Sequence, residues 1–320
     1  MSVPEWLRIV CVAVAPVWIA LAVDRWLGEP PVRAHPVVWM GNYLGAVGRR
    51  IAPVGISSGR RAGPFVAGAL AWCGGAMVVA GTAWGVRCVA DMLPWWAGAV
   101  LVGVLLKPLL AWRMLRDEVL AVDAALAVSL DAGRAQLARL VSRDVRQLSE
   151  GEVRESAIES LAENFNDSVV APVFWFLLLG LPGAALYRFA NTADAMWGYL
   201  GVRNGRDWTW AGKWAARADD ALSWIPARLT ALLVRPVGLM ALRDEARQTP
   251  SPNSGWPMVA MALRLGVRLG KPGVYVLHAA GRVPEAVDVL RAARVGGSAV
   301  FWLGLEVLVV EGLVVWGTGC

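Results

Sequence analysis

The sequence alternates between long apolar stretches and regions rich in polar residues. Four apolar stretches, at 6–23, 65–86, 93–112 and 298–317, are each about 18–22 residues long. A 20-residue helix rises roughly 30 Å, which is the thickness of the hydrocarbon layer of a bilayer. The pattern therefore predicts four transmembrane helices.

A fifth apolar stretch, 169–187, is long enough to cross a bilayer but is interrupted. Pro172 lies near its start, and the sequence "GLPG" occupies 180–183. Proline removes a backbone donor and clashes with the preceding helical turn, so it kinks or ends a helix. We predict that this stretch enters the membrane and returns to the side it left, with a fifth full span as the alternative.

Three polar regions, 24–62, 113–168 and 188–297, separate the apolar stretches and hold most of the chain's 31 Lys and Arg. Basic loops tend to stay on the cytoplasmic side of a membrane. We therefore predict an all-α, multi-pass protein of the cell (inner or plasma) membrane, with one membrane-embedded domain over 1–320. Amphipathic helices are expected in its cytoplasmic loops, and no sheet is expected.

Composition supports this interpretation. The chain is 57% hydrophobic, has a mean hydropathy of +0.50 and contains 18 Trp, and only 18% of its residues are charged. Soluble domains carry about 25% charged residues. The net charge of +6 and the pI near 9.5 suit basic loops beside anionic lipid, so we expect the bilayer as a partner and no nucleic acid.

One polar segment concentrates like charge. Glu155, Glu159, Glu163 and Asp167 recur every four residues, and at about 100° per residue they share one side of a helix. Each such pair costs roughly 0.2–0.5 kcal/mol, so the three pairs oppose the helix by about 1 kcal/mol unless positive charge lies among them. Ser149 and Glu152 have capping-box spacing and predict a helix that begins near Glu150.

These residues have the chemistry of a metal-and-phosphate site. Carboxylates and an amide one turn apart can bind Mg²⁺ while water and phosphate oxygens complete its shell. The candidate metal ligands are Glu159, Glu163, Asn166, Asp167 and Asp194, with Asn191 beside Asp194 as a second cluster. Lys213, Arg217 and Arg228 are candidates for phosphate contacts.

Each candidate has a structural alternative. The acidic helix face could be a solvated surface, and Asp194 could pair with neighbouring arginines. His35 is a candidate base or ligand, with a hydrogen-bonded turn residue as the alternative. No P-loop, G-x-S-x-G elbow, H-E-x-x-H motif or Rossmann glycine run occurs, and two histidines exclude a His-rich metal site.

Several segments resemble one family in order along nearly the whole chain. They are "DRWLGEPPVRAHPVVWMG", the block from "SRDVRQLSEGEVRESAIESLAENFNDS" to "NTADAMWGY", "GKWAARADDALSWIPARLTALL" and "SPNSGWPM". These segments are similar to the CobD/CbiB family, the adenosylcobinamide-phosphate synthases of cobalamin biosynthesis.

The resemblance implies an amide ligase. Its expected substrates are adenosylcobyric acid, a corrinoid, and an amino-alcohol phosphate such as aminopropanol phosphate, with ATP as cosubstrate and Mg²⁺. Glu159, Glu163, Asp167 and His35 are then the expected catalytic residues. Substrate contacts are expected from Asn191, Asp194, Lys213, Arg217, Arg228, Asp24 and Glu29.

Two other classes of function fit the same residues. One is an intramembrane prenyl- or alcohol-phosphate transferase that uses Mg²⁺. The other is a non-catalytic membrane scaffold for late corrinoid enzymes, and association with such enzymes is also compatible with the ligase. Formation of the amide by the purified protein would separate these alternatives.

Overall fold

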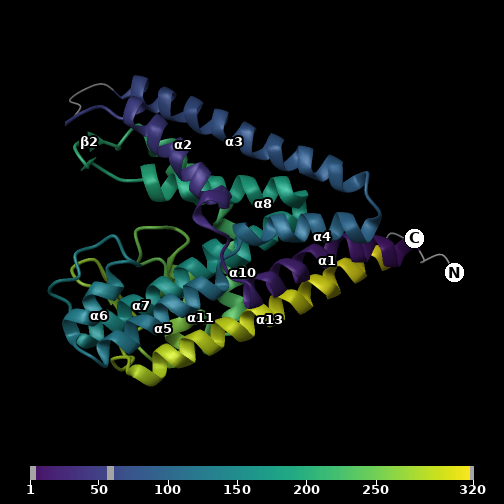
Figure 1. Cartoon of the computed structure of the whole chain (residues 1–320). Helices are drawn as coiled ribbons and strands as arrows, with labels where there is room; N and C mark the ends of the chain where they lie inside the picture. Colours follow the sequence, from purple (N-terminus) through teal and green to yellow (C-terminus); the bar gives the residue numbers. More distant parts are fainter. Residues whose placement is uncertain (1–4, 56–60, 318–320) are drawn as a thin grey trace. The chain divides into compact units, whose positions relative to one another are not determined.

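The computed structural model describes residues 5–55 and 61–317, and it is mostly helical (Figure 1). Side chains are described at 14–55, 61–238 and 240–308. The chain divides into two compact units, each assembled from separated stretches: unit 1 is Met1–Leu110, Ala171–Leu222 and Val307–Cys320, and unit 2 is Ala111–Val170 and Ser223–Glu306. The sequence predicted a single domain, and the structure adds this subdivision.

Unit 1 holds most of the long apolar helices. Its core includes Trp72 of the third helix, which packs on Phe189 at a ring-centroid distance of 5.9 Å. Gly75 makes room for Phe189, because a Cβ atom there would lie 2.5 Å from the Phe189 ring. The elements of unit 1 are α1 (Glu5–Trp26), η1 (Val32–Ala34), α2 (Pro36–Ile51), α3 (Ala62–Asp91), α4 (Trp95–Leu106), η2 (Lys107–Leu109), α8 (Ala171–Trp197), β1 (Val202–Arg203), β2 (Arg206–Asp207) and α9 (Lys213–Leu222).

Unit 2 is built around the acidic helix, α7 (Glu150–Phe165), which packs against α5 (Trp112–Leu126), α6 (Leu130–Leu137), α12 (Gly255–Leu265) and β3 (Leu269–Lys271). Val153, Ile158, Leu161 and Phe165 are fully buried on α7. The other elements are the π-helix η3 (Asn166–Val170), α10 (Trp224–Val234), α11 (Leu239–Ala246), β4 (Tyr275–Leu277) and α13 (Ala286–Gly317), whose last residues belong to unit 1.

Three helical stretches are long and apolar enough to cross a membrane, namely Ala62–Asp91, Trp95–Leu126 and Glu150–Trp197. They include the predicted spans 65–86 and 93–112 and the interrupted stretch 169–187. The other two predicted spans, 6–23 and 298–317, are helical and belong to α1 and α13. Their side chains are described only from residue 14 in α1 and up to residue 308 in α13. The membrane character is confirmed, and the count of four spans stays a prediction.

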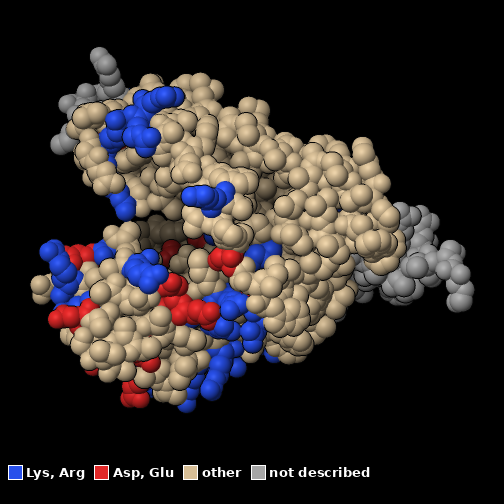
Figure 2. All heavy atoms as spheres, viewed as in Figure 1, with Lys and Arg blue, Asp and Glu red and all other residues tan. Residues whose placement is uncertain are grey.

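The surface of α3 is that of a lipid-facing helix. Leu70, Met77 and Trp84, which are two turns apart, are all largely exposed. An apolar stripe of this length on a water-exposed helix would be unfavourable. In Figure 2 this helix presents mainly uncharged atoms, whereas the visible face of unit 2 carries many acidic and basic side chains.

Helix α8 breaks inside the interrupted apolar stretch. Gly180 has φ 65° and ψ −159°, a conformation outside the helical region. Around it the chain bends sharply, because a Cβ atom at Gly183 would meet the carbonyl oxygen of Trp175 and would lie 2.6 Å from Leu179 Cβ. In a continuous helix, residues eight apart are roughly 12 Å apart. The predicted break is present as a kink, and re-entry of the segment into the membrane stays a prediction.

We expect Gly180→Ala to destabilise the protein by about 1–3 kcal/mol, since this backbone conformation is open essentially only to glycine. Thermal unfolding in detergent micelles measures the loss. Gly85→Ala on α3 is the matched control, because a Cβ there meets no atom within 4 Å and the helix gains a better helix former. Equal unfolding temperatures for the two variants would contradict the strained break at Gly180.

Two short antiparallel hairpins correct the prediction that no sheet forms. Asn204 and Gly205, with φ 51° and 74°, connect β1 to β2, and both positive φ angles suit the Asn-Gly turn that matches strand twist. Pro272, Gly273 and Val274 connect β3 to β4, and Val274 N donates to Lys271 O at 2.9 Å. Pro followed by Gly is typical of a type II turn. Local turn chemistry, not strand periodicity, specifies both hairpins.

Candidate active site

Helix α7 begins where the sequence predicts. Ser149 Oγ accepts a hydrogen bond from Glu152 N, and Glu152 Oε2 accepts one from Ser149 N at 2.7 Å. This capping box satisfies two backbone donors at the helix start and confirms the predicted first residue, Glu150.

Two acids of the α7 stripe are turned into unit 2, whereas Glu163 is exposed. Glu155 and Glu159 are each only 3% exposed. Glu155 Oε1 pairs with Arg268 Nε at 2.9 Å, and Glu159 Oε2 pairs with Arg143 Nη2 at 2.7 Å. For these two carboxylates a solvated surface is therefore wrong, and arginines distant in sequence relieve their repulsion.

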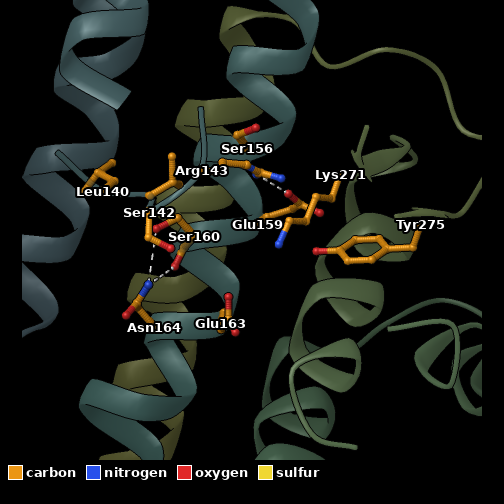
Figure 3. A pocket seen from close by; sticks show the side chains of 11 residues that line it. Leu140, Ser142, Arg143, Ser156, Glu159, Ser160, Glu163, Asn164, Lys271 and Tyr275 are labelled. Carbon is orange, nitrogen blue, oxygen red and sulfur yellow. Dashed lines mark hydrogen bonds and ion pairs between the residues drawn. The ribbon is translucent and has the colours of Figure 1, made fainter. Parts of the chain in front are cut away.

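A pocket of about 180 Å³ opens beside the C-terminal half of α7 (Figure 3). One wall is the face of α7, a second is the segment before α7, and a third is the β3–β4 hairpin. The lining residues are Leu140, Val141, Ser142, Arg143, Ser156, Glu159, Ser160, Glu163, Asn164, Lys271 and Tyr275. Two carboxylates, two cations, three serine hydroxyls, a phenol and an amide thus surround one small cavity.

Several polar atoms of this pocket are buried without a hydrogen-bond partner among the described residues. They are Glu159 Oε1, Arg143 Nη1 and Ser156 Oγ. Leaving a buried donor or acceptor unpaired costs about 1–3 kcal/mol, and more when the group is charged. These atoms therefore supply unused donors and an unused carboxylate oxygen to a bound molecule.

Lys271 and Tyr275 reach the pocket from the β3–β4 hairpin. Figure 3 shows both side chains pointing towards Glu159 and Glu163. Burial raises the pKa of Tyr275, and the negative charges of Glu159 and Glu163 raise it further. Tyr275 therefore keeps its proton at neutral pH, and its hydroxyl is a hydrogen-bond donor whose recorded acceptor is the weak one Met258 Sδ, at 3.9 Å.

The two remaining residues of the predicted acidic site directly follow α7 in the chain. Asn166 is buried, accepts a hydrogen bond from Thr230 Oγ1 at 3.0 Å and donates one to Asp167 Oδ1 at 2.8 Å. Both residues lie in the π-helix η3, a form that occurs frequently at functional sites. The structure does not place either of them in the lining of the pocket.

The donor set of the pocket fits a Mg²⁺ ion that takes only one or two ligands from the protein. Within 5–55 and 61–317, no group of three His, Cys, Asp or Glu is placed to hold a metal. Mg²⁺ commonly binds through only one or two carboxylates while water and substrate phosphates fill the other positions. The unpaired Oε1 of Glu159 would supply one such oxygen, and Glu163 lies one turn on in the same lining.

The N-terminal candidates form a separate ionic network in unit 1. Lys107 Nζ lies 3.3 Å from Asp24 Oδ1 and 2.7 Å from Glu29 Oε1, and Lys107 and Asp24 are 2% and 1% exposed. Burial alone would raise the pKa of Glu29, but hydrogen bonds with His35 and Lys107 lower it. The network is held by opposite charges.

His35 occupies a capping position. Its Nδ1 accepts a hydrogen bond from Val37 N at 3.2 Å at the start of α2, and its Nε2 lies 3.1 Å from Glu29 Oε2. Both ring nitrogens therefore have partners, which matches the structural alternative of a hydrogen-bonded turn residue.

The other predicted residues of unit 1 lie on α8 and α9. Asn191 Nδ2 donates to Asp219 Oδ1 at 3.5 Å, and the Asp194 carboxylate lies against the backbone of Gly198. On α9, Lys213 lies 4.2 Å from the Trp210 ring centroid, and Arg217, whose side chain is 75% exposed, lies 3.9 Å from Asp220. The structure groups these residues in unit 1, whereas the pocket of α7 belongs to unit 2.

Arg228, in unit 2, lies close to two aromatic rings. Its guanidinium lies 4.3 Å from the Trp224 ring centroid and 4.6 Å from that of Trp256, and it donates to Asn253 Oδ1 at 2.8 Å. These contacts favour a structural role that joins α10 to the start of α12.

Sequence reasoning missed Arg143, Lys271, Tyr275 and Lys107. Of these, Lys107 carries a signal of its own, since an ionisable residue inside a predicted span is a functional candidate by default. Arg143 belongs to the quoted segment "SRDVRQ" but has no periodic relation to the acids of α7. The Pro-Gly turn indicates the hairpin that carries Lys271 and Tyr275. Only the packing of β3 against α7 shows that both side chains reach the pocket.

Comparisons with known proteins agree along the chain. Residues 17–295 match the model of the family described as CobD/Cbib protein. The chain is 40% identical over 311 residues to a probable cobalamin biosynthesis protein CobD of Thermococcus kodakarensis, which covers 96% of this chain and 97% of that protein. It is 37% identical over 328 residues to the cobalamin biosynthesis protein CobD of Brucella suis, with 93% and 94% covered. No solved structure matches the chain.

Proposed function

The chain belongs to the CobD/CbiB family and is an enzyme of cobalamin biosynthesis, and from this premise we propose that it joins adenosylcobyric acid to an amino-alcohol phosphate. The new bond is an amide between the free propionate carboxyl and the amine, and the product is adenosylcobinamide phosphate. The observation that carries the proposal is the mixed charge of the α7 pocket, in which Glu159 and Glu163 face Arg143 and Lys271.

An amino-alcohol phosphate carries an ammonium at one end and a phosphate at the other. A carboxylate suits the first group, and Lys and Arg suit the second. The pocket offers both within about 180 Å³, a size for a small molecule and not for a corrinoid. We therefore assign the amino-alcohol phosphate to this pocket.

Amide formation needs activation, because a carboxylate and an ammonium at neutral pH form a salt. In the proposed reaction the propionate oxygen attacks the γ-phosphorus of ATP and releases ADP. The amine nitrogen then attacks the acyl carbon, and inorganic phosphate leaves. Mg²⁺, when bound, supplies positive charge that stabilises the phosphoryl oxygens.

Residues of the pocket have distinct proposed roles. Glu163, which is open to the cavity, accepts the proton that the ammonium loses, and Glu159 Oε1 would hold the metal. Arg143 Nη1 and Lys271 bind the phosphate. Tyr275, with its raised pKa, donates a hydrogen bond to the same anion.

This assignment changes the expected phosphate contacts. Lys213 and Arg217 are exposed on α9 of unit 1, so Arg143 and Lys271 replace them in the proposal. Asn191 and Asp194 remain proposed substrate contacts of unit 1. The use of ATP also places the polar regions on the cytoplasmic side of the cell membrane in this proposal, where other late corrinoid enzymes could associate with them.

The test is amide formation by the purified protein with adenosylcobyric acid, amino-alcohol phosphate, ATP and Mg²⁺, measured by mass spectrometry. Lys271→Gln is expected to lower kcat/KM for the phosphorylated amine about tenfold or more beyond any loss for the unphosphorylated amine, since a charged hydrogen bond contributes roughly 1.5–3 kcal/mol. Lys213→Gln, which removes an exposed lysine of unit 1, is the control and should leave this ratio unchanged.

Three outcomes would contradict the proposal. Equal losses for the two amines would remove Lys271 from phosphate binding. Turnover of an isoprenoid diphosphate in place of the corrinoid would favour a transferase. A complete absence of turnover in protein that still binds other corrinoid enzymes would favour a scaffold.

A further inference from the structure

A second pocket, of about 450 Å³, lies in unit 1 and has no part in the proposed chemistry of the α7 pocket. It is formed by the C-terminal half of α2, the end of α8 and the β1–β2 hairpin. Its lining residues are Leu44, Gly45, Arg49, Ala195, Met196, Trp197, Tyr199, Arg203, Asn204, Arg206 and Trp208. Three arginines and three aromatic residues line it, and no carboxylate does. Figure 2 shows basic side chains gathered at the end of unit 1 where Figure 1 labels α2 and β2.

The three arginines have no acidic partner in the parts of the chain that the structure describes. Neither Arg49, Arg203 nor Arg206 forms an ion pair with a residue of 5–55 or 61–317. Arg206 Nη1 donates to Ala52 O at 2.7 Å, and Arg203 lies 3.7 Å from the centroid of the Tyr199 ring. These contacts orient the side chains, and most of the five donors of each guanidinium have no partner among the described residues.

The hairpin places two of these arginines opposite each other. Arg203 and Arg206 are direct cross-strand partners in the β1–β2 ribbon, and the Asn204–Gly205 turn fixes that register. Like charges directly opposite each other destabilise a strand pair. An anion bound between the two guanidinium groups would relieve this repulsion.

The rest of the wall indicates the kind of anion. Trp197 and Trp208 stack with their ring centroids 6.2 Å apart, and Trp197 is fixed by a hydrogen bond from Nε1 to Leu44 O at 3.1 Å. Small-molecule pockets of about 300–1,000 Å³ combine such apolar walls with a few charged groups. The cavity therefore suits a phosphate attached to a larger planar or apolar body.

We propose that this pocket is a phosphate-binding site, with Arg49, Arg203 and Arg206 as its ligands. Two sources have this chemistry, a nucleotide polyphosphate and the headgroup of an anionic lipid. A bound nucleotide would be the ATP of the proposed ligase, and that identification rests on the proposed function. Phosphate binding itself does not depend on it.

The experiment measures binding without turnover. Purified full-length protein in phosphatidylcholine nanodiscs is titrated with labelled ATP in the absence of corrinoid and amine. A second arm measures retention of phosphatidylglycerol from mixed nanodiscs by native mass spectrometry. Arg203→Gln and Arg49→Gln are expected to weaken binding of one of these ligands about tenfold or more each.

Arg50→Gln is the matched control, because Arg50 follows Arg49 on α2, is exposed and does not line the pocket. Should Arg203→Gln fail to fold, Arg49→Gln on the exposed side of α2 gives the same test. Selective weakening of ATP identifies a nucleotide site, and selective weakening of phosphatidylglycerol identifies a headgroup site. Either result supports phosphate binding.

Two results would overturn the inference. Wild-type affinity of both pocket variants for both ligands would remove the site. An equal loss in Arg50→Gln would show only diffuse surface charge. Retained ATP binding in protein that forms no amide would instead count against the proposed ligase and leave this site standing.

Discussion

Glu163→Gln is expected to leave the protein folded and to lower the rate of amide formation by roughly a hundredfold or more, the usual contribution of a general base. The amide side chain has nearly the same shape as the carboxylate but cannot accept the proton of the ammonium. Single-turnover formation of adenosylcobinamide phosphate at saturating substrates measures the change. The effect should appear in the rate constant more than in the affinity for the amine.

The same substitution is expected to raise the unfolding temperature slightly. Glu163 lies one turn from both Glu159 and Asp167, and each like-charge pair at this spacing costs roughly 0.2–0.5 kcal/mol. A gain in stability combined with a loss of activity is common at functional sites, where charge is arranged for chemistry.

Glu150→Gln is the control for Glu163→Gln. Glu150 is on the first turn of the same helix, and its exposed carboxylate pairs with Arg154 at 2.7 Å, a partly solvent-screened contact that contributes about 1 kcal/mol. Wild-type activity in Glu163→Gln, or an equal loss in Glu150→Gln, would remove Glu163 from the chemistry and leave it as a source of local repulsion.

The local features of the site follow from the sequence. The capping box at Ser149 and Glu152 fixes the start of α7, and the four-residue spacing of the acids fixes the face that they share. Both are properties of a single helix. They depend on backbone geometry within a few residues, so a sequence is enough to predict them.

The partners of those acids could not be predicted in this way. Arg143 precedes α7 in an irregular segment, and Lys271 lies more than a hundred residues beyond Glu159, on a hairpin that periodicity does not indicate. Only the packing of α7 against β3 brings Lys271 to the pocket. Tertiary packing therefore decided whether the acidic face would meet water or cations.

The apolar stretches show the same division between local and tertiary information. Their length and composition predict helices able to cross a membrane, and the structure has them. The "GLPG" sequence predicts a break, and the break occurs at Gly180. The extent of the bend depends on contacts around Gly183 that no sequence rule supplies.

Removal of the buried charge of Lys107 is expected to have the largest effect on stability. Lys107 is 2% exposed and lies between Asp24 and Glu29. Lys107→Met keeps the length of the side chain but leaves two carboxylates without this cation. Breaking a buried ion pair by removing one partner costs about 3–5 kcal/mol, so the unfolding transition in detergent micelles should move to clearly lower temperature.

Two further variants test whether the effect comes from charge. Lys213→Met removes an exposed lysine of the same unit, whose contact with Trp210 contributes about 0.5–1 kcal/mol, and should cost no more than that. Combining Lys107→Met with Asp24→Asn and Glu29→Gln should recover most of the lost stability, because replacing a whole buried ionic group by neutral residues is often nearly neutral. If the combined variant unfolded as readily as Lys107→Met alone, the lysine would stabilise unit 1 through the packing of its alkyl chain and not through its charge.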